Sequence, residues 1–97
     1  MSTKEIEFDS GELRIYETVL GYLFILNTTS TISSSLTIEH NMKLKIKAQI
    51  TFSGATGNNN SQSQFIRVTS NTLIIAIYNG CSLNPTAAWS AYIPKMY

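Results

Sequence analysis

Hydrophobic and polar residues alternate without interruption over residues 42–52. A period of two places successive side chains on opposite faces of a β-strand, whereas a helix would scatter them around its circumference. The pattern predicts one long strand that turns a single apolar face toward a core. Its apolar members are Met42, Leu44, Ile46, Ala48, Ile50 and Phe52, and its polar members are Lys43, Lys45, Lys47, Gln49 and Thr51.

Shorter segments of strand-like sequence follow one another along the chain, separated by residues typical of turns. Segment 72–78 is apolar on both faces, which indicates a central strand covered on two sides. Asp9-Ser10-Gly11, His40-Asn41 and Ser70-Asn71 supply turn chemistry. The shorter strands are expected at residues 4–8, 36–39, 64–69, 72–78 and 88–93.

Two stretches are harder to assign. The long apolar run from Leu13 to Leu26 fits a helix or a strand by spacing, but its composition and Gly21 favour one or two strands with a bend or bulge at the glycine. The pattern leaves open whether its part from Val19 to Leu26 lines the core or a subunit contact. Residues 53–61 hold no apolar side chain larger than alanine, so burial cannot offset the entropy of ordering them, and a mobile hairpin tip is expected.

The expected fold class follows from these segments. About seven short strands joined by turns, with no internal repeat, predict an all-β protein, a small antiparallel β-sandwich or barrel. A chain of 97 residues is too short for several cores, so residues 1–97 are expected to form a single β domain.

A resemblance supports the same class. Segment 71–79 resembles part of a small bacterial all-β family of unknown function, in which a central apolar strand ends in an aromatic-Asn step, here Tyr78-Asn79. Asp9-Ser10-Gly11 and segment 45–52 are compatible with that family. The chain departs from it after Asn79, where Gly80-Cys81 and segment 85–89 replace Asn and Gly residues. The resemblance implies no activity and transfers no site residue.

Composition narrows the function. The chain is 43% hydrophobic and only 13% charged, with a formal net charge of +1, so it lacks the excess of positive charge that nucleic-acid binding needs. So little net charge opposes self-association only weakly, and a homo-oligomer is therefore expected. The start of the sequence has no apolar leader and no stretch is long enough to span a membrane, so a cytoplasmic protein without a membrane partner is expected.

Groups suited to catalysis are scarce. A nucleophile and base pair could be formed only from Cys81 and His40, and a lone cysteine is more often a small buried hydrophobic residue. Glu39 and His40 fall short of the three ligands of a catalytic zinc site, and no phosphate-binding glycine loop is present. The sequence therefore predicts a protein that is not an enzyme and has no catalytic, metal-binding or cofactor-binding residues and no cofactor.

Lys43, Lys45 and Lys47 would lie on one side of the predicted strand 42–52, and three interpretations of this stripe compete. The stripe could be a solvated face that discourages edge-to-edge pairing. It could meet Glu5 and Glu7, on a neighbouring strand or across a subunit contact. It could also bind phosphate or an acidic partner, although three lysines alone would bind nucleic acid weakly.

Aromatic residues gather near the end of the sequence, at Trp89, Tyr92 and Tyr97. They either close the core or form an exposed group that anchors a protein partner or a sugar ring. The candidate interaction residues are therefore Lys43, Lys45, Lys47, Trp89, Tyr92 and Tyr97.

The expected function is a non-enzymatic protein–protein interaction module, homo-oligomeric, that contacts another protein through exposed sheet edges or the C-terminal aromatic segment. By analogy, short chains without catalytic groups include accessory and inhibitory proteins of bacteria and phages, such as anti-defence proteins. The alternative is a carbohydrate- or small-ligand-binding β-domain that uses Trp89, Tyr92 and the Asn58-Asn59-Asn60 tip.

Overall fold

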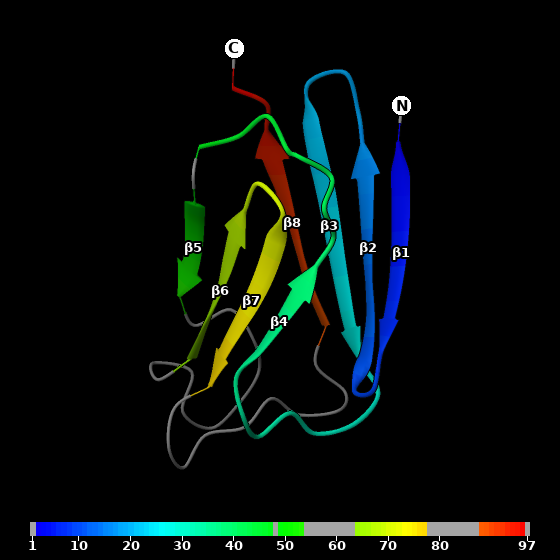
Figure 1. The fold of residues 1–97 in the computed structure, drawn as a ribbon, viewed down its shortest axis with the longest axis vertical. Helices are drawn as coiled ribbons and strands as arrows, with labels where there is room; N and C mark the ends of the chain where they lie inside the picture. The colour runs from blue at the N-terminus through cyan, green and yellow to red at the C-terminus, as the bar shows by residue number, and fades with distance from the viewer. Residues whose placement is uncertain (1, 48, 54–63, 78–87, 97) are drawn as a thin grey trace.

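Two antiparallel sheets of four strands each form the protein in a computed structural model, which describes residues 2–47, 49–53, 64–77 and 88–96 (Figure 1). The predicted all-β class is confirmed, and no strand of one described sheet is hydrogen-bonded to the other sheet, so the fold is a β-sandwich. The first sheet, in spatial order, contains β1 (Thr3–Phe8), β2 (Gly11–Glu17), β3 (Gly21–Thr28) and β8 (Ala88–Pro94). The second contains β4 (Leu36–Glu39), β7 (Thr72–Ile77), β6 (Gln64–Thr69) and β5 (Gln49–Ser53).

One core lies between the sheets. Leu13 and Ile15 of β2 and Leu73 of β7 have no exposed surface, while Arg14, between the first two, lies on the outer face of its sheet and is half-buried. This is the period of two that a strand imposes on its side chains. The buried hydrophobic cluster draws members from both sheets, and it also includes Ile32, Leu44 and Ile46 from segments outside the strands.

The short hairpins form where the turn residues predict them. Asp9-Ser10 joins β1 to β2, and Ser70-Asn71 joins β6 to β7. In the second turn the Thr72 backbone N–H donates to the Thr69 hydroxyl oxygen at 3.0 Å, which ties together the two residues that flank the turn. β7 lies inside its sheet between β4 and β6, in agreement with the central strand predicted at 72–78.

The predicted strand 42–52 is largely wrong. Only its last part is a strand, β5, while residues 40–47 form an irregular crossing segment that runs over one end of the sandwich from β4 toward β5 (Figure 1). Asn41 and Lys43 have φ angles of 57° and 53°, in the left-handed region, which an extended strand does not contain. His40-Asn41 therefore does not form a hairpin turn, although Asn41 adopts the expected left-handed conformation.

Backbone hydrogen bonds attach the crossing segment to the end of the sandwich. The N–H groups of His40 and Asn41 donate to the carbonyl oxygen of Asn71 at 2.9 and 3.0 Å, and the N–H of Leu44 donates to that of Ser70 at 2.9 Å. Leu44 and Ile46 are buried, whereas the three lysines of this segment are exposed. The alternation of apolar and polar residues therefore reports burial here without strand pairing.

The apolar run from Val19 to Leu26 contains a turn. Thr18, Val19 and Leu20 form the connection between β2 and β3, and Gly21 begins β3, so the expected bend at the glycine is the start of a new strand. The run divides in its environment as well. Phe24 and Leu26 belong to the core, whereas Val19 and Leu20 are 65% and 68% exposed.

Several predicted features lie outside the described residues. These are most of the hairpin tip expected at 53–61, with Asn58-Asn59-Asn60, and also Tyr78, Cys81 and Tyr97.

Candidate functional site

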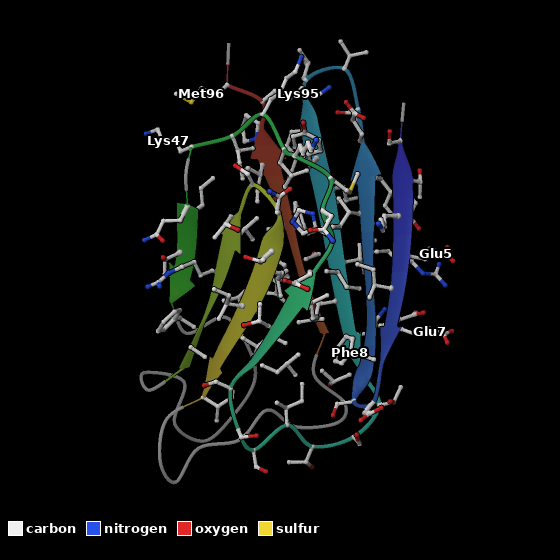
Figure 2. All side chains as sticks on the ribbon, viewed as in Figure 1. Glu5, Glu7, Phe8, Lys47, Lys95 and Met96 are labelled. Carbon is white, nitrogen blue, oxygen red and sulfur yellow. The ribbon has the colours of Figure 1, made fainter. Side chains whose placement is uncertain are left out.

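The lysine stripe and the acidic residues of β1 do not meet within the molecule. Lys47 lies at the end of the sandwich where the crossing segment runs, whereas Glu5 and Glu7 lie along β1 at the far side of the first sheet (Figure 2). Glu5 instead approaches Arg14 on the neighbouring strand, with 3.8 Å between Oε1 and Nε. Pairing of the stripe with Glu5 and Glu7 across neighbouring strands is therefore excluded, because Lys43, Lys45 and Lys47 are not on a strand at all.

The aromatic residues near the end of the sequence differ in burial. Trp89 is only 7% exposed and belongs to the core, paired in register with Leu26 of β3, so its assignment to an exposed contact group is wrong. Tyr92, three residues later on the same strand, is 48% exposed. A sugar-binding surface therefore lacks the tryptophan face that it was expected to use, while Tyr92 stays available for contacts.

His40 is a buried structural residue. Its side chain has no exposed surface, its Nδ1 accepts a hydrogen bond from the Met42 N–H at 3.1 Å, and its ring packs edge-on against Phe24. Burial lowers the pKa of His40; the Thr69 carbonyl group opposes this shift, and the positive charge of Lys4 adds to it. Nε2 is buried without a hydrogen-bond partner among the described residues. A neutral ring enclosed in this way is not accessible to a substrate.

The described residues hold neither a metal-binding cluster nor a membrane-spanning helix. No group of three or more His, Cys, Asp or Glu side chains is placed to hold a metal ion within the described ranges. The same ranges contain no helix of the length and apolar character that crossing a bilayer requires.

Exposed apolar side chains gather at one end of the sandwich. The large hydrophobic residues that stay exposed in the described part of the chain come from the β2–β3 turn and from the end of β8. Both lie at the upper end in Figure 1. We call this surface the tip patch, and it consists of Val19, Leu20, Tyr92 and Met96.

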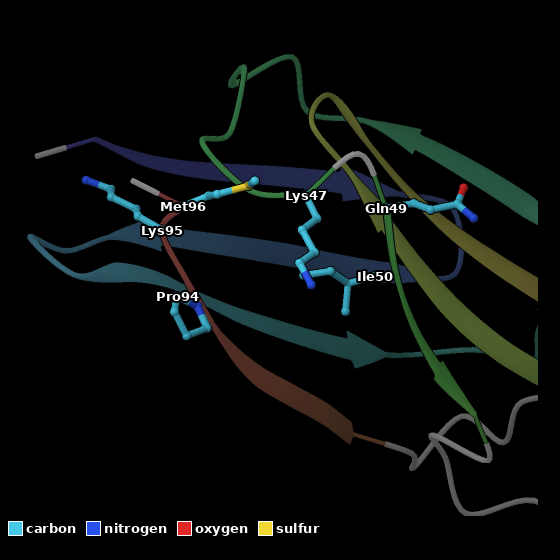
Figure 3. Close-up of a pocket in the computed structure, with 6 residues that line it drawn as sticks. All are labelled: Lys47, Gln49, Ile50, Pro94, Lys95 and Met96. Atoms are coloured by element: carbon cyan, nitrogen blue, oxygen red, sulfur yellow. The ribbon is translucent and has the colours of Figure 1, made fainter.

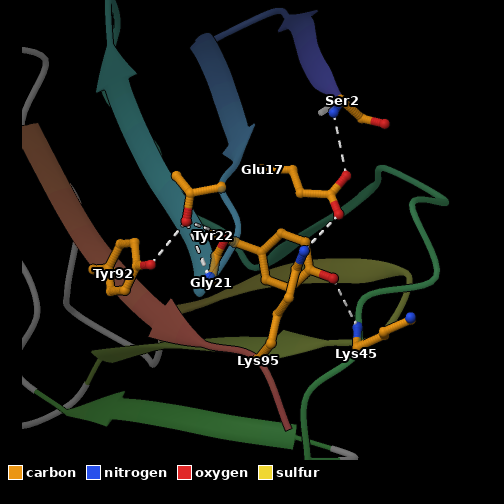
Figure 4. A network of polar contacts seen from close by, with 8 residues as sticks. Ser2, Glu17, Gly21, Tyr22, Lys45, Tyr92 and Lys95 are labelled. Atoms are coloured by element: carbon orange, nitrogen blue, oxygen red, sulfur yellow. Dashed lines mark hydrogen bonds and ion pairs between the residues drawn. The ribbon is translucent and has the colours of Figure 1, made fainter. Parts of the chain in front are cut away.

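Local hydrogen bonds hold the tip patch in shape. The Thr18 N–H donates to the Gly21 carbonyl oxygen at 2.7 Å, and the Gly21 N–H donates to the Thr18 hydroxyl oxygen at 3.0 Å, which closes the turn. The Lys95 N–H donates to the Leu20 carbonyl oxygen at 2.8 Å, so the end of β8 is attached to the turn. The hydroxyl groups of Thr18 and Tyr92 lie 2.8 Å apart and link the two parts of the patch (Figure 4).

Beside the tip patch lies a groove of about 530 Å³ between the outer strands β5 and β8 (Figure 3). Ile50, Pro94 and Met96 give it apolar walls, and Lys47 adds positive charge. Lys95 also lines the groove, but its ammonium group is paired with Glu17. Met96 belongs to both the groove and the tip patch, so the two form one continuous surface.

An ion pair supports this end from within. Lys95 Nζ lies 2.8 Å from Glu17 Oε2, and the Ser2 N–H donates to Glu17 Oε1 at 3.2 Å (Figure 4). These contacts, with that of Lys95 as the largest, lower the pKa of Glu17. Lys95 also lies over the ring of Tyr22, 5.4 Å from its centroid, and the Tyr22 hydroxyl accepts the Lys45 N–H at 3.0 Å.

Sequence reasoning missed the tip patch because Val19 and Leu20 sit inside an apolar run that reads as a strand. The residues on either side of them, Thr18 and Gly21, were the available signal of a turn. Thr18 can bond the backbone through its hydroxyl group, and Gly21 tolerates the close approach of β8, because a Cβ there would lie 2.5 Å from the Ile93 carbonyl oxygen.

No family model matches the sequence, and no curated protein or solved structure shows significant similarity to the chain.

Proposed function

We propose that this protein is a non-enzymatic protein–protein interaction module that binds through the tip patch and the adjoining groove. The observation that carries the proposal is the gathering of Val19, Leu20, Tyr92 and Met96 at one end, at 48% to 68% exposure. Large apolar side chains that gather exposed at one end of a molecule are typical of contact sites.

The rigidity of the patch supports this function. Tyr92 is a large side chain with few rotatable bonds, and its hydroxyl group is already held by Thr18. The turn that carries Val19 and Leu20 is closed by backbone and hydroxyl hydrogen bonds. A surface ordered before binding loses little conformational entropy when a partner covers it, and tyrosine is enriched among the residues that dominate binding energy.

The groove gives the contact its polarity. A partner side chain that enters between β5 and β8 would meet Ile50 and Met96 within and Lys47 at the rim. We therefore infer a partner surface with an apolar centre and an acidic rim, since such a surface complements both the tip patch and Lys47. A second copy of the chain is one such partner in our proposal, because a net charge of +1 gives little mutual repulsion.

The proposal is tested with the double variant Val19→Ser/Leu20→Ser. Both side chains are exposed, so the fold should survive, while the apolar surface of the turn is lost. The matched control is Ser33→Ala/Ser34→Ala, at two exposed positions in the β3–β4 connection. We expect light scattering over a concentration series to show oligomers for the wild-type chain and the control, and monomers for the tip variant.

Partner capture from the native host forms the second arm of the test. A protein retained by the wild-type chain and the control but lost from the tip variant supports the interaction function, even if the chain alone is monomeric. Identical binding and identical oligomeric state in all three proteins would refute the proposal.

A further inference from the structure

We propose that a second pocket, between the start of β1 and the crossing segment, binds the phosphate group of an anionic ligand. This basic pocket has a volume of about 360 Å³ and lies outside the tip patch. Its lining includes Lys4, Glu17, Tyr22, Met42, Lys43 and Lys45.

The positive charge around the basic pocket favours an anionic ligand. None of the six acidic side chains, all within the described ranges, forms an ion pair with Lys4, Lys43 or Lys45. The one acid in the wall, Glu17, is occupied, because its two carboxylate oxygens are bound by the Lys95 ammonium group and the Ser2 N–H. Among the acidic side chains of the described residues, the three lysines therefore have no carboxylate partner, and the one that lines the pocket, Glu17, is already compensated.

Hydrogen bonds hold the backbone that carries Lys43 and Lys45. The Lys43 N–H donates to Asn71 Oδ1 at 3.0 Å, which holds Lys43 in its left-handed conformation. The carbonyl oxygen of Lys45 accepts the Met96 N–H at 2.6 Å, and its N–H is bound by the Tyr22 hydroxyl. The crossing segment thus presents Lys43 and Lys45 from anchored positions, which lowers the entropy lost on binding.

The Tyr22 hydroxyl group offers the pocket a hydrogen-bond donor. It accepts the Lys45 N–H, and its own hydrogen has no acceptor among the described residues. Tyr22 is only 4% exposed, so this donor lies in the wall of the pocket. A pocket rich in donors and positive charge selects a ligand made of acceptor oxygens. A phosphate group, with close to two negative charges at pH 7, matches three lysines better than a carboxylate does.

Titration with inorganic phosphate, followed by amide chemical shifts at constant ionic strength, tests the site. We expect saturable shifts at residues of the basic pocket. Lys43→Gln/Lys45→Gln should weaken binding about a hundredfold, at about tenfold for each charged hydrogen bond removed. Lys47→Gln is the matched control, since Lys47 belongs to the same segment but does not line this pocket.

The Lys47→Gln control distinguishes binding at the basic pocket from nonspecific attraction of phosphate to positive charge. Equal weakening by Lys47→Gln and by the double variant, or no saturable shift with the wild-type chain, would overturn the proposal. A third variant, Tyr22→Phe, keeps the ring and removes the hydroxyl group, both as a donor to the ligand and as the acceptor that anchors the Lys45 N–H. Weaker phosphate binding by Tyr22→Phe supports the role of the hydroxyl, and unchanged binding would contradict it.

Two sources of the phosphate group are distinguished by parallel arms. Glycerol phosphate represents a soluble phosphomonoester, and vesicles of phosphatidylcholine with and without phosphatidic acid represent a lipid headgroup. Lysine-dependent binding in either arm supports the pocket and names the source, while failure in both contradicts it. The tip variant of the proposed function leaves every lining residue intact, so the two proposals fail independently.

Discussion

The ammonium nitrogen of Lys95 lies 2.8 Å from a carboxylate oxygen of Glu17, although 78 positions separate the two residues in the sequence. The pair ties the end of β8 to the end of β2, and its lysine side chain is only 9% exposed. The contact therefore links the two parts of the chain that carry the tip patch.

Removal of the Lys95–Glu17 ion pair should make the stability of the fold change less as pH falls from 7 to 2. Because the pKa of Glu17 is lowered in the folded protein, the unfolded chain binds the proton first as pH falls. The stabilisation is present above the ordinary glutamate pKa of about 4.3 and is lost as pH falls through the lower folded value. We expect Glu17→Gln to lower the unfolding midpoint at pH 7 and to leave it nearly unchanged at pH 2, measured by urea denaturation.

A second pH dependence should come from His40. Its pKa is lowered by burial, so the unfolded chain takes up a proton more readily, and stability should fall as pH drops below about 6.5. His40→Gln removes the titrating group and should flatten the dependence between pH 7 and 5, although the variant itself is less stable. Denaturation midpoints at pH 8, 6 and 5 measure the effect, and an unchanged slope in the variant would contradict it.

Gly21 should not tolerate a side chain. A Cβ there would lie 2.5 Å from the Ile93 carbonyl oxygen and 2.8 Å from the ring of Tyr92, so the backbone of β8 would have to move. We expect Gly21→Ala to lower the free energy of unfolding by about 1–3 kcal/mol, as overpacking does elsewhere. Ser34→Ala, at an exposed position, should change it by less than about 0.5 kcal/mol.

Trp89, the single tryptophan of the chain, reports on its own burial. At 7% exposure its fluorescence should be shifted to the blue and poorly quenched by iodide in the native protein, and both properties should change on unfolding. Native emission at the wavelength of free tryptophan would show that the residue is not in the core.

The strands were predictable where side-chain alternation and backbone pairing coincide. β6 has the limits expected from the sequence, and β7 is the inner strand that its two apolar faces predict. Residues 42–47 break this agreement, since their backbone bonds to Asn71, Ser70, Tyr22 and Met96 rather than to a neighbouring strand. Alternation records which side chains face the core, and it does not record which groups complete the backbone hydrogen bonds.

The candidate surfaces were less predictable because they depend on tertiary contacts. Lys43 and Lys45 stood out in the sequence, but the third lysine of the basic pocket, Lys4, comes from β1. The tip patch likewise combines the β2–β3 turn with the end of β8, and no local pattern joins Leu20 to Met96. Tyr92 could be placed in such a surface, whereas Trp89 on the same strand points to the core.

The acidic residues of β1 disfavour pairing of two copies of the chain along this strand. β1 is an outer strand, and a twofold antiparallel pairing of two copies about Ile6 would set Glu5 of one chain opposite Glu7 of the other. Like charges directly opposed destabilise a strand pair, so this edge resists fibril-like stacking at neutral pH.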